Sequence, residues 1–127
     1  MTAQQAATTH RQDPCIDSSQ IDGLVDAAGR EGALEILDAF WRSTQSLLAS
    51  LRAQLAAADA AEASRTAHAL KGSALNVGAT RLSRMARAIE DRCRSNDPAG
   101  ALAMMDCADR SYAETVAAFE THLGPAR

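Results

Sequence analysis

The strongest constraint on the fold is an apolar stripe with helical spacing in the first half of the chain. Between residues 31 and 57, apolar or near-apolar side chains recur at alternating steps of three and four, which places them on one face of an α-helix. The positions are Leu34, Leu37, Trp41, Thr44, Leu48, Leu51 and Leu55. The pattern predicts a long helix over about 31–57 that buries this face against other helices.

The composition also favours a helical fold. Alanine occurs 29 times and leucine 12 times, whereas valine and isoleucine together occur seven times, a balance typical of helices rather than strands. The prolines stand at positions 14, 98 and 125, so they leave long stretches free for helix. A length of 127 residues is typical of one domain with one core. We therefore expect a single all-α domain.

Capping residues indicate where two further helices begin. A short first helix starts at a cap on Asp17 or Ser18 and ends at Gly29. Asp59, with Glu62 three residues later, resembles a capping box in which each residue satisfies an amide of the other. The helices that we expect after the long one cover about 60–77, 79–94 and 98–122.

Stop signals between these helices define the topology. Gly78 is a suitable C-terminal residue for the 60–77 helix, and Asp97 with Pro98 begins the last helix. Amphipathic helices joined by short connections predict an up-and-down antiparallel four-helix bundle, with the short N-terminal helix capping one end. We expect residues 1–14 to be a disordered tail and residues 15–124 to form the bundle.

The charge and the cysteines exclude several classes of function. A formal net charge of −3 does not fit a nucleic-acid-binding domain, which needs a basic surface. Cys15, Cys93 and Cys107 form no C-x-x-C motif, so we expect neither a zinc site nor a disulfide framework, and we interpret Cys93 and Cys107 as small buried residues. No segment has the length of a membrane span or the pattern of a signal peptide. We expect a cytoplasmic monomer with no cofactor or metal of its own.

The phase of the 60–77 helix directs His68 away from the core. His68 lies roughly 160° around the helix from Leu70, a member of the inward stripe, and should therefore face solvent. Gly72 lies on the same outer half, although a glycine inside a helix costs about 1 kcal/mol relative to alanine. Its missing side chain leaves clearance about one turn from His68. The predicted inward stripe consists of Ala63, Ala67, Leu70, Ala74 and Val77.

His68 and Lys71, which is the only lysine of the chain, are suited to phosphoryl transfer. At a separation of three residues they are neighbours on a helix surface. A neutral imidazole is a nucleophile, and an ammonium stabilises phosphoryl oxygens. Ser73 could donate a hydrogen bond to the same group or bond to the backbone instead. The sequence contains neither an acidic cluster suited to Mg²⁺ nor a glycine-rich nucleotide loop, which predicts a phosphoryl carrier without kinase activity of its own.

The segment from His68 to Ala79, H-A-L-K-G-S-A-L-N-V-G-A, resembles a known family. Together with Leu82 and the later Ile89-Glu90, it is similar to the histidine-containing phosphotransfer (HPt) domain, whose pattern is roughly H-x-L-K-G-[SA]-[SA]-x-x-x-G-A-x-x-L. The resemblance extends from about Cys15 to Leu123, and the one variation is an alanine at position 74, where serine is frequent.

The resemblance implies both a mechanism and partners. His68 would be the phosphoacceptor at Nε2, Lys71 would assist electrostatically, and Gly72 would provide clearance. The phosphoryl group would pass reversibly between His68 and the aspartate of a receiver domain in a multistep two-component phosphorelay, as in bacterial signalling. Response-regulator receiver domains and hybrid sensor kinases would be the partners, and the receiver would bring Mg²⁺.

Residues around His68 are candidates for docking the partner. The arginines of the 79–94 helix are too many to share one face, and we interpret most of them, with the Glu90–Arg94 pair, as a solvated polar face. Arg84 and Arg87 are the two expected to meet acidic receiver residues. The complete set of predicted docking residues is Ser64, Arg65, Leu75, Arg84 and Arg87.

Two alternatives to a relay protein remain open. The chain could be a non-catalytic helical adaptor that binds a receiver or an enzyme without being phosphorylated. It could also be the HPt module of a hybrid sensor kinase or of a chemotaxis-type kinase, in which an ATP-binding domain phosphorylates the histidine directly. Modules of the chemotaxis type normally continue into a long chain, whereas this sequence stops at Arg127.

Overall fold

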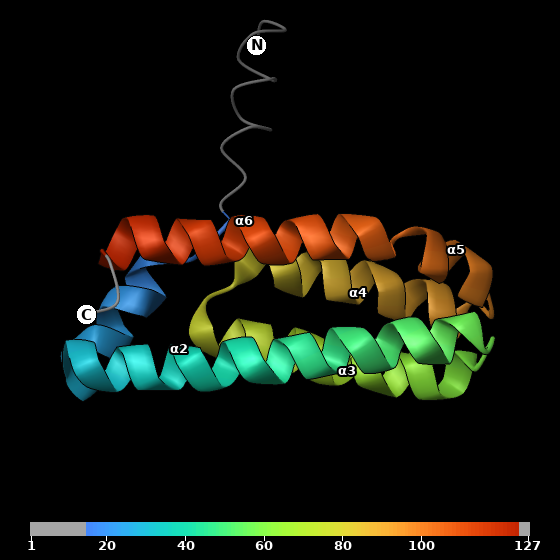
Figure 1. Ribbon diagram of the computed structural model, residues 1–127, viewed down its shortest axis with the longest axis horizontal. Helices are drawn as coiled ribbons and strands as arrows, with labels where there is room; N and C mark the ends of the chain where they lie inside the picture. The colour runs from blue at the N-terminus through green and yellow to red at the C-terminus, as the bar shows by residue number, and fades with distance from the viewer. Residues whose placement is uncertain (1–14, 125–127) are drawn as a thin grey trace, which may run out of the picture.

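The computed structural model describes residues 15–124, and every regular element in that range is a helix (Figure 1). The helices are α2 (Ser18–Ala56), α3 (Ala60–Val77), α4 (Thr80–Arg94), α5 (Pro98–Ala103) and α6 (Met105–Leu123). The four long helices reverse direction in turn, and α3 packs against both α2 and α4 while α6 packs mainly against α4. The predicted antiparallel bundle is confirmed. The predicted tail, residues 1–14, lies outside the described residues.

The first segment of α2 is the predicted capping helix. Asp17 caps it by accepting a hydrogen bond from the amide of Gln20, and Gly29, at φ 77° and ψ 165°, breaks the helical backbone before the long segment begins. This segment is tied to the rest of the bundle at the end where α3 turns into α4. The amide of Asp17 donates to the carbonyl of Gly78 at 2.8 Å, and His122 Nε2 of α6 lies 2.8 Å from Asp22 Oδ1.

The turn between α3 and α4 depends on a glycine. Gly78 ends α3 in the left-handed region at φ 81°, and its amide and that of Ala79 close the helix by bonding to the carbonyls of Leu75 and Ala74. A Cβ at Gly78 would also lie 3.2 Å from the carbonyl oxygen of Asp17. This tight reversal lays α4 antiparallel along α3, which brings residues near the middle of α3 opposite residues near the end of α4.

The core follows the predicted stripes closely. The buried residues of α3 are the five predicted ones, and α4 buries Leu82, Ala86, Ile89 and Cys93 as expected. The α3–α4 interface is rich in alanine, and small side chains let two helix backbones approach each other. α4 also buries two polar residues that the stripe did not include, Ser83 and Glu90.

Three local expectations were wrong. The expected 98–122 helix is interrupted at Met104, whose amide bonds back three residues to the carbonyl of Ala101, a tighter turn that ends α5 before α6 begins. Cys107 is exposed, because it lies on the side of α6 opposite the buried Met105. The capping box forms only in part: Asp59 accepts from the amide of Glu62, but the Glu62 side chain pairs with Arg65 instead.

Candidate functional site

His68 lies on the outer surface of α3, as its helical phase predicted. Its side chain is 64% exposed, whereas the neighbours on the inward stripe, Ala67 and Leu70, are buried. Nδ1 of His68 lies 2.9 Å from Oε2 of Glu90 on α4, and Nε2 has no hydrogen-bond partner among the described residues. One ring nitrogen is therefore fixed by the neighbouring helix, and the other remains available for chemistry.

Glu90 is the centre of the site. Its side chain is only 1% exposed, yet it meets three cationic or titratable groups. Oε2 lies 2.9 Å from His68 Nδ1 and 3.0 Å from the guanidinium of Arg94, while Oε1 accepts from Lys71 Nζ at 2.7 Å. Charges buried without partners are very costly, so this set of contacts explains how a carboxylate can lie between α3 and α4.

The partners of Glu90 keep it ionised. Burial by itself would raise the pKa of Glu90, but hydrogen bonds from Lys71 and His68, together with the charges of Lys71 and Arg94, outweigh burial and hold the pKa below its ordinary value. An ionised carboxylate only accepts hydrogen bonds. His68 Nδ1 must therefore carry the proton in this contact, and a neutral ring in this tautomer has its lone pair on Nε2.

The other predicted site residues of α3 lie around this pair. Lys71 is 23% exposed and is anchored by Glu90, so its ammonium is held beside the imidazole instead of moving freely. Gly72 is exposed, and a Cβ built there would meet nothing within 4 Å. Packing within the chain therefore does not require a glycine at this position. Ser73 is partly buried, and its hydroxyl makes no hydrogen bond among the described residues.

Two hollows adjoin the site, and together they contain all five predicted docking residues. A smaller one of about 260 Å³ is lined by Ser64, Arg65 and His68 of α3 with Glu90 and Arg94 of α4. A larger one of about 450 Å³ runs between α3 and α4, and its lining includes Leu75, Arg84 and Arg87. The structure thus brings the predicted docking residues into one region, on either side of the His68–Glu90 contact.

The sequence predicted that Glu90 and Arg94 lie on a solvated polar face, and this prediction is wrong for Glu90. The carboxylate is buried because it is four residues after Ala86 and seven after Ser83, which places it on the flank of the buried face of α4. That spacing was visible in the sequence. Its partners were not, because His68 and Lys71 come from another helix.

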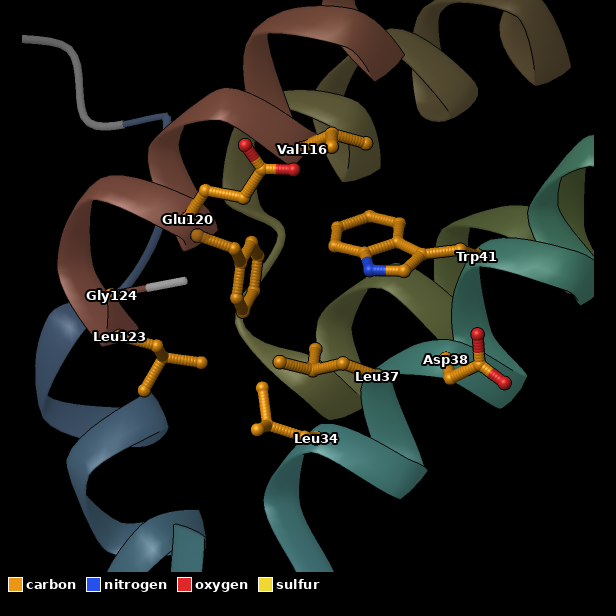
Figure 2. Close-up of a pocket in the computed structure, with 9 residues that line it drawn as sticks. Leu34, Leu37, Asp38, Trp41, Val116, Glu120, Leu123 and Gly124 are labelled. Carbon is orange, nitrogen blue, oxygen red and sulfur yellow. The ribbon is translucent and has the colours of Figure 1, made fainter. Parts of the chain in front are cut away.

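A third hollow lies away from this chemistry, between α2 and α6 (Figure 2). It has a volume of about 420 Å³ and apolar walls that include Leu34, Trp41 and Phe119, with Asp38 and Glu120 among its lining residues. Trp41 packs edge-on against Phe119 at a centroid distance of 5.3 Å, so the wall also belongs to the core. The hollow is lined by no histidine, lysine or cysteine.

Among residues 15–124, no group of three or more histidine, cysteine, aspartate or glutamate side chains is arranged to hold a metal ion. Within that range, none of the helices combines the length and the hydropathy that a membrane span requires.

Comparison with known proteins identifies the family. Residues 35–122 match the model of the Hpt domain, and the chain therefore belongs to the Hpt domain family. The solved structure of histidine-containing phosphotransfer protein B (HptB) from Pseudomonas aeruginosa PAO1 is similar with a TM-score of 0.81 and 27% sequence identity, over 91% of this chain and 99% of that one.

A second solved structure shares the fold. It is a rice protein described as a histidine-containing phosphotransfer protein, with a TM-score of 0.73 and 19% identity over 93% of this chain and 85% of that chain. Comparison with curated proteins gave no match. The family predicted from the His68 motif is confirmed.

Proposed function

We propose that this protein is a phosphoryl carrier in which His68 accepts a phosphoryl group from the aspartate of a receiver domain and returns it to such an aspartate. Membership of the Hpt family supports histidine phosphotransfer in a phosphorelay. The observation that supports His68 as the acceptor is its contact with Glu90, since this carboxylate fixes the proton on Nδ1 and leaves a lone pair on exposed Nε2.

The transfer needs no oxidant or further reactant. Nε2 attacks the phosphorus of the acyl phosphate, the P–N bond forms, the P–O bond to the aspartate breaks, and the aspartate leaves as a carboxylate. The ring keeps its Nδ1 proton and gains positive charge as the bond forms. Glu90, 2.9 Å from Nδ1, stabilises that charge, and the reverse step returns a neutral ring.

The neighbouring residues on α3 supply charge and access. Lys71, held by Glu90, stabilises the oxygens of the phosphoryl group on His68, and Ser73 can add a hydrogen bond to them. Gly72 lets the receiver backbone approach the imidazole, because no side chain stands there. In this proposal the receiver supplies Mg²⁺, and the carrier requires no metal of its own.

The test is transfer of radiolabelled phosphoryl groups from phosphorylated receiver domains of the same organism. Wild type should acquire a label that is stable in alkali and labile in acid, as a phosphohistidine is, whereas His68→Gln should acquire none. His122→Gln is a matched control, because His122 lies on α6, outside the site, and contacts Asp22 of α2. Label that persists in His68→Gln would refute the proposal. Binding of receivers without label on wild type would favour the adaptor function instead.

A further inference from the structure

The larger hollow beside His68 has a charge pattern that the transfer chemistry does not use. This groove between α3 and α4 contains Lys71 and Arg94, which both pair with Glu90 within the site. Arg84 and Arg87 also line it, and both are exposed residues of α4. The groove is therefore locally basic on a chain whose formal net charge is −3.

Arg87 is the cation that the bundle itself does not engage. It makes no ion pair and no hydrogen bond among the described residues, whereas the exposed arginines Arg42 and Arg65 each pair with a carboxylate of their own helix. Asp91 is the other acidic residue that lines the groove. Since it is four residues after Arg87 and the two make no ion pair, the guanidinium of Arg87 is available to a partner.

An apolar contact point lies in the same groove. Leu75 of α3 is 53% exposed, and Ile36 of α2 is the other large exposed apolar side chain among the described residues. Leu75 is seven residues after His68, about two helical turns along the same surface. The groove thus combines an anchor for an apolar side chain with a cation for a carboxylate, next to the phosphoacceptor.

We propose that this groove selects among receiver domains, and that it favours a receiver whose contact face has a carboxylate opposite Arg87 and an apolar side chain that packs on Leu75. This inference rests on the proposed function, which makes receiver domains the partners. It adds the contacts by which one receiver domain is preferred over another. Charges at the edge of an interface mainly set the association rate and its salt dependence, so the preference should weaken as salt rises.

The experiment measures equilibrium binding of wild type and charge variants to purified, unphosphorylated receiver domains of the same organism. With the receiver that binds wild type most tightly, Arg87→Glu should weaken binding about tenfold at low salt, and the loss should shrink in high salt. Arg110→Glu on α6 changes the net charge equally at an exposed arginine outside the groove, and it should change binding by less than about twofold.

Further variants test the apolar contact at Leu75 and the charge complementarity between Arg87 and the receiver. Leu75→Ala should weaken binding about equally at low and high salt, whereas Ile36→Ala, at the other exposed apolar residue, should not. A carboxylate-to-lysine change on the receiver, made at the position facing Arg87, should weaken binding to wild type. The same receiver variant should regain affinity for Arg87→Glu.

The outcomes separate this inference from the proposed function. If Arg87→Glu binds as tightly as wild type, or if Arg110→Glu loses as much affinity, charge selection by the groove is wrong even where transfer to His68 is observed. If wild type binds acidic receivers with the predicted salt dependence but never becomes labelled, the groove is supported and the phosphoryl carrier is refuted.

Discussion

The sharpest prediction concerns Glu90, because the structure gives its carboxylate two separable tasks. It holds the imidazole of His68 in one orientation through the 2.9 Å contact with Nδ1. In the proposed transfer it also supplies negative charge as the ring becomes positive. Glu90→Gln keeps an acceptor of similar shape but removes the charge. Glu90→Ala removes both the acceptor and the charge.

The magnitudes follow from the hydrogen bond. A hydrogen bond to a charged group contributes about 1.5–3 kcal/mol, compared with about 0.5–1.5 kcal/mol for a neutral one. The difference of about 1–1.5 kcal/mol corresponds to about a tenfold slower transfer in Glu90→Gln, since 1.36 kcal/mol is a factor of ten in rate. Losing the orientation as well should slow Glu90→Ala about a hundredfold.

The assay is single-turnover transfer from a phosphorylated receiver, followed by rapid quenching. Glu120→Gln provides a matched control, because Glu120 lies on α6 beside the α2–α6 hollow, away from His68. Nitrogen NMR of His68 supplies a readout that a loss of stability alone would not change: the proton should reside on Nδ1 in wild type and be shared between both nitrogens in Glu90→Gln. Wild-type transfer by both Glu90 variants would show that the carboxylate plays no part in the reaction.

Further predictions address stability and reactivity. Because the folded-state pKa of Glu90 is below its ordinary 4.5, the wild type should have a higher unfolding free energy than Glu90→Gln above that pH. It should lose this advantage as the pH falls below 4.5, and urea titrations at several pH values would measure the change. Gly72→Ala should raise the unfolding free energy by about 0.5–1 kcal/mol, since a Cβ has space there, yet slow receiver-dependent labelling. Ala58→Gly should stabilise the fold by about 1 kcal/mol in the same titrations, because Ala58 adopts φ 56° between α2 and α3. Mass spectrometry after brief alkylation should find Cys107 modified well before Cys93, since burial, aided by the nearby charges of Asp97 and Glu90, raises the pKa of the Cys93 thiol.

The sequence was sufficient to predict features that depend on local rules. Helical phase placed His68 outside and Leu70 inside, and both positions follow from 3.6 residues per turn. The ends of α3 at Asp59 and Gly78 were also predictable, because a side-chain cap and a left-handed glycine are local devices. The interruption at Met104 had no such signal: it is marked by neither glycine nor proline.

The role of Glu90 shows why the rest of the site could not be predicted from the residues alone. In the sequence it is one of several charged residues on an arginine-rich helix, and its nearest opposite charge is Arg94, an ordinary pair at four residues' spacing. His68 is 22 residues away and Lys71 is 19 residues away. Only the packing of α4 on α3 converts that surface pair into a buried carboxylate with partners on two helices.

The packing and the chemistry of this site therefore depend on the same interface. The alanines of the facing stripes, among them Ala67 and Ala86, allow α3 and α4 to lie close together, and this proximity brings Glu90 within 2.9 Å of a histidine that itself points to solvent. The cations in turn make the burial of Glu90 tolerable, since they hold it ionised between the helices. An exposed histidine on an isolated helix could interconvert freely between tautomers. On this bundle one tautomer is favoured before any partner arrives, and the proposed nucleophile is therefore prepared in advance.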